Sequence, residues 1–134
     1  MNIDNIILSL NQRPIAYYPI YTKIAGGTAA GILLSQLMYW LSAVNGREFY
    51  KTDDEIMQET GLSAKELRLA KAKLKASIFV KIKVKGVPPK TFYKFDLKQL
   101  AEKLDECQQE RLNSGSPKGE NNLAEKAISI SPKG

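Results

Sequence analysis

The spacing of apolar residues changes partway along the chain and divides it into helical and extended segments. Over residues 63–77, apolar residues recur at the i, i+3, i+7 spacing of one helix face, at Leu67, Ala70 and Leu74. Over residues 79–85 the period is two, with lysine at alternate positions, which is typical of a half-buried strand. The pattern therefore predicts a helix followed directly by a strand.

Capping signals mark where two helices begin. Thr52 and Ser63 each precede a glutamate by three residues, and this spacing forms a capping box at a helix start. Gly61 is expected to end the first helix in a tight turn. A second strand, rich in aromatics, returns after a turn that contains Gly and Pro. We therefore expect a helix-turn-helix over 52–77 and a β-hairpin, or wing, over 79–95.

The apolar positions of residues 53–70 match those of a helix-turn-helix. Counted from Asp53, apolar residues or glycine occupy the positions at which two crossing helices must pack: Ile56, Gly61, Leu62, Leu67 and Ala70. Met57 and Thr60 depart from the usual small and aliphatic residue types. Because a basic hairpin follows at once, the segment predicts a winged helix, in an α+β, mainly α fold class.

The segment before the helix-turn-helix predicts short elements. Residues 6–8 could form a short strand or a packing arm. Pro19 is expected to open a short helix that stops at Gly26-Gly27, because proline suits a helix start and glycine its end. Residues 47–51 read as a short strand, since Phe and Tyr favour extended structure.

An uncharged run of 21 residues, from 24 to 44, is long enough to span a membrane. It contains a Gly-x-x-x-Gly spacing that lets two helices approach closely. A glycine pair at 26–27 splits the run, however, and Thr28 is expected to cap a helix of only 17 residues that ends at Val44. We therefore interpret it as a buried core helix and expect no membrane partner.

The chain after the hairpin predicts one more helix and a tail. Asp96 is expected to cap a helix over 96–112, in which Leu97, Leu100, Leu104 and Cys107 are spaced by 3, 4 and 3. This seam could join two copies as a homodimer or pack on the domain, and packing is favoured because a coiled coil needs about three or more heptads. Residues 113–134 predict a disordered low-complexity tail, so that the winged-helix domain covers 1–112.

Positive charge is concentrated in the helix-turn-helix and the hairpin. The chain carries 20 Lys and Arg against 14 Asp and Glu, a formal net charge of +6. Ten of those cations lie between residues 64 and 94, against a single acid, Glu66. Such a local excess is the electrostatic footprint of a nucleic-acid-binding protein.

The composition excludes several kinds of catalysis. The chain has no histidine, which removes Ser-His-Asp and Cys-His catalysis and histidine metal sites. Its one cysteine, Cys107, follows two acids and reads as a partly buried structural thiol. No phosphate-binding glycine loop or secretory signal is visible in the sequence. We therefore expect a cytoplasmic, non-enzymatic protein without cofactor or metal.

The helix over 63–77 is the expected recognition element. With its apolar face inward, a helical wheel turns outward Lys65, Arg68, Leu69, Ala72 and Ala76. Arg68 is the candidate for a guanine edge, because its fork can pair with O6 and N7. Lysines of the helix and of the hairpin would neutralise phosphates. These lysines are Lys65, Lys71, Lys73, Lys75, Lys83, Lys85 and Lys90.

Leu69 leaves a second interpretation open. An outward leucine can contact a thymine methyl group or mark a protein-binding surface. In the second case Leu69, Ala72 and an outward Trp40 or Tyr39 would bind a replication or host protein. Aromatic residues are few and are not expected among the cations, so stacking of single-stranded nucleic acid is not favoured.

Four stretches of the chain carry a family resemblance: Arg13–Pro19, Thr28–Trp40, Phe49–Asp53 and Gly86–Tyr93. Together they resemble the N-terminal winged-helix domain of phage and plasmid replication proteins, of the replisome-organiser or initiator type. The resemblance covers about residues 13–100. It implies binding of origin or other duplex DNA, and contacts with helicase-loading partners, in a bacterial or bacterial-host cytoplasm.

The expected function is therefore binding of double-stranded DNA, in replication initiation of a phage or plasmid or in transcription regulation through the same contacts. In either role the helix over 63–77 would dock in a major groove, and the hairpin would rest on the flanking backbone.

Overall fold

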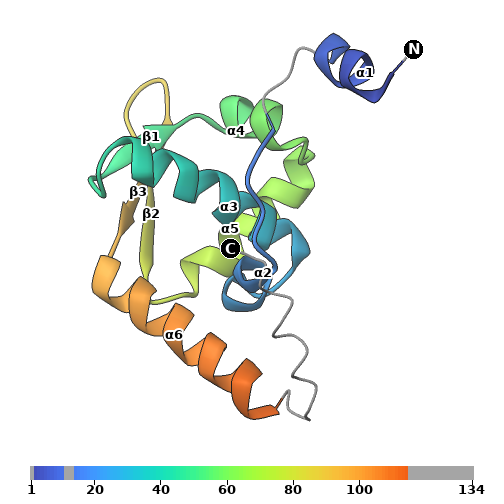
Figure 1. Cartoon of the computed structure of the whole chain (residues 1–134). Coiled ribbons are helices and arrows are strands. Elements are labelled where there is room, and N and C mark those ends of the chain that lie inside the picture. Colours follow the sequence, from blue (N-terminus) through green and yellow to red (C-terminus); the bar gives the residue numbers. More distant parts are fainter. Residues whose placement is uncertain (1, 11–13, 115–134) are drawn as a thin grey trace.

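The structure, a computed structural model, describes residues 2–10 and 14–114 (Figure 1). It has an α+β, mainly helical architecture with one antiparallel sheet in the strand order β1-β3-β2. The order of its elements is compatible with a winged-helix layout. The elements are α1 Ile3–Ser9, α2 Pro19–Ala25, α3 Thr28–Ala43, β1 Phe49–Lys51, α4 Asp53–Thr60, α5 Ala64–Lys75, β2 Val80–Lys85, β3 Lys90–Phe95 and α6 Leu97–Ser114.

α3 is the central helix of the fold. Leu33, Leu34 and Leu37 are fully buried, and α3 packs against both α2 and α5. Figure 1 shows it crossing the middle of the molecule, with the sheet at one of its ends. Within the described residues, no single helix is both long and apolar enough to cross a membrane; α2 and α3 pass that test only as a pair, and the pair is bent by 111°.

α2 and α3 approach each other backbone to backbone at Gly31. A Cβ atom placed on Gly31 would lie 2.8 Å from the Thr22 Cα atom and 3.0 Å from the Thr22 nitrogen. Gly26 turns the chain between the two helices in the left-handed region, with φ of 92°, where a side chain would be strained. The second glycine of the Gly-x-x-x-Gly spacing, Gly31, therefore serves helix packing within this chain.

Two expectations for the N-terminal part were wrong. Residues 3–9 form the helix α1 rather than a strand, and all of them are exposed, so they are no packing arm either. Asn2 caps α1, because its side-chain oxygen accepts a hydrogen bond from the Asn5 amide at 2.9 Å. Thr28 is the first residue of α3, and Gly27 before it holds the cap position without a side-chain hydrogen bond.

The helix-turn-helix segment forms α4 and α5 close to the expected boundaries. Both capping boxes are present: the hydroxyl oxygens of Thr52 and Ser63 each accept a hydrogen bond, at 3.1 Å, from the amide of the glutamate three residues on. Gly61 ends α4 in the left-handed region, with φ of 79°. Signals within a few residues of each helix end thus suffice to place both helices.

The sheet packs one face on the helices and leaves the other in solvent. β3 lies between its neighbours, so that Tyr93 pairs with Phe49 on one side and with Ile82 on the other. These three side chains are buried. The alternation over 79–85 places Val84 on the same side as Ile82, but Val84 is 59% exposed. The far end of the hairpin therefore extends beyond the helices that would cover it.

Tyr93 is fully buried, and its hydroxyl has no hydrogen-bond partner within the described residues. Burial, together with the nearby Asp53 carboxylate, raises the pKa of Tyr93. Because an unpaired buried hydroxyl costs free energy, Tyr93→Phe is expected to raise the free energy of unfolding by about 1 kcal/mol. Urea denaturation measures this change. A loss of stability on substitution would mean that the hydroxyl is hydrogen-bonded, for instance to water.

α6 packs on the body of the protein. Leu100 and Cys107 are buried and Leu104 is partly buried against the same core. The packing interpretation of this seam is therefore confirmed, although Leu97 is 51% exposed. Asp96 caps the helix as expected, since its carboxylate accepts from the Gln99 amide at 3.1 Å. α6 continues to residue 114, and the predicted tail beyond it lies outside the described residues.

A polar network joins α3, β1 and α4 around Glu59. One oxygen of the Glu59 carboxylate accepts hydrogen bonds from Gln36 Nε2 and Trp40 Nε1, each at 2.8 Å. The other oxygen accepts from Lys51 Nζ at 2.8 Å. The Lys51 amine also lies 3.8 Å from the centroid of the Trp40 ring. The network therefore satisfies polar groups on three elements at once, as partly buried polar groups require.

Candidate nucleic-acid interface

α5 is held by one face and presents the other to solvent. Leu67, Ala70 and Leu74 are buried in the core, as the spacing predicts. The opposite face consists of exposed residues: Lys65, Arg68, Leu69, Ala72, Lys75 and Ala76. We call these six residues the α5 face. An α-helix that is exposed along one side has the width to enter a DNA major groove.

The cations of the α5 face are free to bind a ligand. In the part of the chain that the structure describes, Lys65, Arg68 and Lys75 have no ion pair or hydrogen bond through their side chains. The acid of this helix, Glu66, accepts a hydrogen bond from the Ser63 amide at 2.9 Å within the capping box. Its charge therefore lies at the beginning of α5, where the helix dipole favours an anion.

Two other lysines of this helix that were predicted to contact DNA, Lys71 and Lys73, form bonds with other parts of the protein. Lys71 Nζ lies 2.8 Å from Asp53 Oδ1 and 3.3 Å from Thr91 Oγ1, and its side chain is only 15% exposed. Lys73 Nζ donates to the Gly26 carbonyl at 2.7 Å. These amines tie α5 to α4, to β3 and to the turn between α2 and α3, so we leave both out of the interface.

The hairpin carries its lysines on the solvent face of the sheet. Lys81, Lys83 and Lys94 are exposed and have no ion-pair partner among the described residues. Lys85 Nζ lies 3.9 Å from Glu48 and 4.5 Å from the centroid of the Phe92 ring. Lys90 Nζ lies 4.5 Å from the centroid of the Tyr50 ring. All of the hairpin lysines predicted to contact DNA therefore share this face.

Aromatic rings do lie among the cations, contrary to the sequence-based expectation. The register of the sheet places Tyr50 beside Phe92 and Phe92 beside Lys83 on the solvent face. The ring centroids of Tyr50 and Phe92 are 5.3 Å apart. The alternation of β3 could have placed Phe92 on this face, but Tyr50 comes from a strand that is distant in sequence. Its position depends on the pairing of β1 with β3.

Of the two aromatic residues of α3 in the protein-binding interpretation, Tyr39 is exposed and Trp40 is not. Trp40 is partly buried, and its indole N–H is bonded to Glu59. Tyr39 is 42% exposed and packs edge-on against Trp40, with 4.9 Å between the ring centroids. Leu69 is 50% exposed on the α5 face. Of the residues in that interpretation, Leu69 and Tyr39 are therefore the large side chains that a partner could reach.

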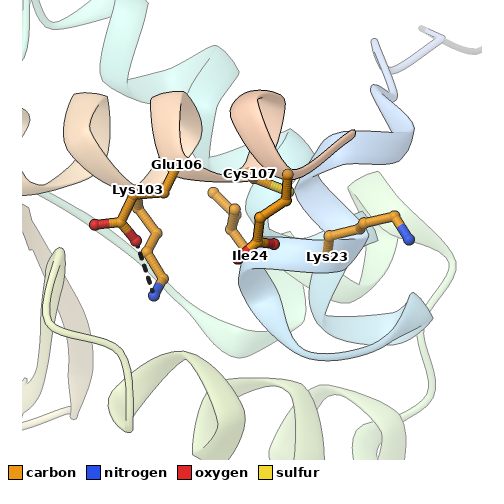
Figure 2. Close-up of a pocket in the computed structure, with 6 residues that line it drawn as sticks. Lys23, Ile24, Lys103, Glu106 and Cys107 are labelled. Carbon is orange, nitrogen blue, oxygen red and sulfur yellow. Dashed lines mark ion pairs between the residues drawn. The ribbon is translucent and has the colours of Figure 1, made fainter. Parts of the chain in front are cut away.

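A depression of about 420 Å³ lies between α2 and α6 (Figure 2). Figure 2 shows the Lys103 amine turned toward Glu106, with which it forms an ion pair at 3.8 Å, and the Lys23 amine pointing away from both. Charges of both signs line this depression and offset each other. It therefore offers no concentrated charge for an anionic or cationic ligand.

No group of three or more Cys, Asp and Glu side chains in the described ranges is placed to hold a metal ion. Comparisons of the chain with protein-family models, with curated proteins and with solved structures found no match.

Proposed function

We propose that the protein binds double-stranded DNA as a winged helix, with α5 in the major groove. The observation that carries this proposal is the α5 face. It combines small and apolar residues with three cations that have no ion-pair partner among the described residues, on a helix anchored by its opposite side. Neutralisation of phosphates by such cations releases counterions and supplies most of the affinity for duplex DNA.

Each residue of the α5 face has a role in this proposal. Arg68, near the middle of the exposed stretch, pairs with the edge of a guanine through its two-pronged guanidinium. Lys65 and Lys75 lie toward the two ends of α5 and contact phosphates. Ala72 is small enough to let the helix approach the groove floor, and Leu69 contacts a thymine methyl group. The hairpin lysines contact the backbone beside the groove.

The biological context that we propose is replication initiation of a phage or plasmid, in keeping with the resemblance of residues 13–100 to such proteins. A repressor would use the same duplex contacts. Selection of binding sites from random duplexes distinguishes the two roles, because an origin binder should select a sequence that recurs in a replication origin, and a repressor one that overlaps a promoter.

A salt titration of duplex binding tests the proposal. With four to six phosphate contacts, log K is expected to fall against log salt with a slope of about −4 to −5 between about 50 and 200 mM salt. The triple variant Lys65→Ala/Arg68→Ala/Lys75→Ala should lower the steepness of that slope by about 1.8, since Lys65 and Lys75 contact phosphates and each such contact contributes about 0.9. Fluorescence anisotropy of a labelled duplex measures both values.

A matched variant separates the α5 face from net charge. Lys23→Ala/Lys98→Ala/Lys103→Ala removes the same charge from α2 and α6, and we expect it to keep a slope close to that of the parent protein. Arg68→Ala alone should reduce discrimination between selected and random duplexes. A flat salt response, or no duplex binding at low salt, would overturn the proposal and favour a protein partner centred on Leu69.

A further inference from the structure

The solvent face of the sheet forms a second cationic surface, separate from the α5 face. It combines five lysines with two aromatic rings from three strands, and we call it the sheet platform. Its residues are Tyr50, Lys81, Lys83, Lys85, Lys90, Phe92 and Lys94. The other face of the same strands is packed into the core, which holds the platform side chains on the solvent side of the sheet.

The two rings of the platform lie beside each other on β1 and β3. Tyr50 on β1 is 47% exposed, and Phe92 on β3 is partly buried beside it. Their planes are tilted by 46° at a centroid separation of 5.3 Å. Lys83 flanks Phe92 on β2, while Lys81 pairs with Lys94, and Lys85 with Lys90, on either side along the strands. Lysines of β2 and β3 therefore border the two rings.

The lysines over the rings can give way to a ligand. The amines of Lys85 and Lys90 lie 4.5 Å from the centroids of Phe92 and Tyr50. An exposed cation–π contact is worth a factor of about 2 to 5 in an equilibrium constant. Stacking of a nucleobase on an aromatic side chain is worth a factor of about 5 to 150. Displacement of an amine by a base is therefore favourable, and the displaced amine becomes available to a phosphate.

We propose that the sheet platform binds a short segment of single-stranded nucleic acid, with bases stacked on Tyr50 and Phe92 and phosphates on the surrounding lysines. In a duplex the base faces are already stacked on one another, so only an unpaired strand can use the rings. An acidic peptide would use the amines but not the rings. Three strands span about 10 Å across the sheet, which suits two or three nucleotides.

The inference does not rest on duplex binding by α5. The platform shares its lysines with the proposed backbone contacts of the hairpin, but its two rings take no part in the duplex contacts. The Glu48 carboxylate borders the platform, 3.9 Å from the Lys85 amine. Because it repels phosphate, its removal should strengthen binding. Substitution of Glu48 should therefore change the affinity in the opposite direction to substitution of the two rings, on the same surface.

Anisotropy of a labelled oligothymidine of about ten nucleotides tests the platform with the full chain. The variant Tyr50→Leu/Phe92→Leu is expected to bind it roughly tenfold or more weakly, while Glu48→Gln binds it more tightly. Tyr50→Phe should keep the affinity of the parent protein, because the ring remains. Tyr39→Leu removes an exposed tyrosine from another surface and should change nothing. Parent-like binding by the ring variant would overturn the proposal.

Two further results decide between rings and charge alone. Cross-linking of a 5-iodouracil oligonucleotide should map to Tyr50 or Phe92, whereas cross-links confined to α5 would contradict the proposal. Full competition by inorganic polyphosphate together with parent-like binding by the ring variant would indicate a polyanion surface only. If Tyr50→Leu/Phe92→Leu does not fold, the exposed single substitution Tyr50→Leu decides. An oligouridine arm tells whether RNA is bound as well as DNA.

The two proposals can fail separately. Arg68→Ala should weaken selected duplexes and leave oligothymidine binding unchanged, and Tyr50→Leu should do the reverse. If both substitutions weaken the binding of both ligands equally, one surface binds both, and the platform is not a distinct site.

Discussion

Replacement of Glu59 with alanine is expected to lower the free energy of unfolding by about 3 kcal/mol. The substitution leaves the Lys51 ammonium, whose side chain is only 11% exposed, without its partner at 2.8 Å. It also removes the acceptor of the buried Gln36 amide and of the Trp40 indole. A donor that is buried and unpaired costs more than the bond itself contributed, which makes this loss large.

The Glu59 carboxylate also makes the free energy of unfolding depend on pH. Burial acts to raise the pKa of Glu59, but the hydrogen bonds from Lys51, Trp40 and Gln36 outweigh it and hold the pKa below its ordinary value. A carboxyl with a lowered pKa in the folded state contributes its stability above the unfolded value of about 4.3. That contribution is lost as the pH falls through the lower, folded value.

Urea denaturation as a function of pH measures both effects. Glu59→Gln should show a shallower fall in stability below about pH 5 than the parent protein, because glutamine does not titrate. Glu102→Ala, on the exposed side of α6, is the control and should change stability by less than about 0.5 kcal/mol. Unchanged stability in Glu59→Ala would mean that the network contributes nothing to folding.

Gly31→Ala is expected to lower the free energy of unfolding by about 2 kcal/mol. The added methyl group would meet the Thr22 backbone at 2.8 Å, and overpacking of this kind costs about 1–3 kcal/mol or more. Alanine regains up to about 1 kcal/mol through its higher helix propensity. Because the obstacle is main chain, α2 must move away from α3, and a thermal melt should show a fall in Tm of roughly 6–12 °C.

A double substitution identifies which atoms of Thr22 clash with the added methyl group. The Thr22 hydroxyl would lie 2.6 Å from the new methyl group, but the Thr22 Cα atom is nearly as close. Thr22→Ala/Gly31→Ala should therefore remain destabilised relative to Thr22→Ala alone. Recovery to the level of that single variant would show that the side chain, and not the backbone, is the obstacle.

The elements that could be predicted from the sequence are those with short-range signals. The capping boxes at Thr52 and Ser63 and the alternation over 79–85 specify α4, α5 and β2 from neighbouring residues alone. α1 was missed because the isoleucines at 6 and 7 suggested a strand, while Asn2, a good cap, lies before them. A cap thus outweighed β propensity in this short segment.

The candidate site was less predictable because it depends on contacts between distant residues. Lys71 and Lys73 look like their neighbours in the sequence, yet Asp53 and the Gly26 carbonyl, 18 and 47 residues away, engage their amines. Tyr50 faces the hairpin lysines only because β1 pairs with β3 in one register. A helical wheel reports which way a side chain leaves its own helix, and nothing about what it meets there.

The strand order β1-β3-β2 leaves the backbones of β1 and β2 at the margins of the sheet. Exposed margins invite another chain to add a strand, which is the first step of fibril growth. β1 is only three residues long, and β2 repeats lysine at alternate positions. The short length of β1 and the repulsion between the lysines of β2 in neighbouring copies oppose such growth. The amines that attract polyanions therefore also help to keep copies of this protein apart in concentrated solution.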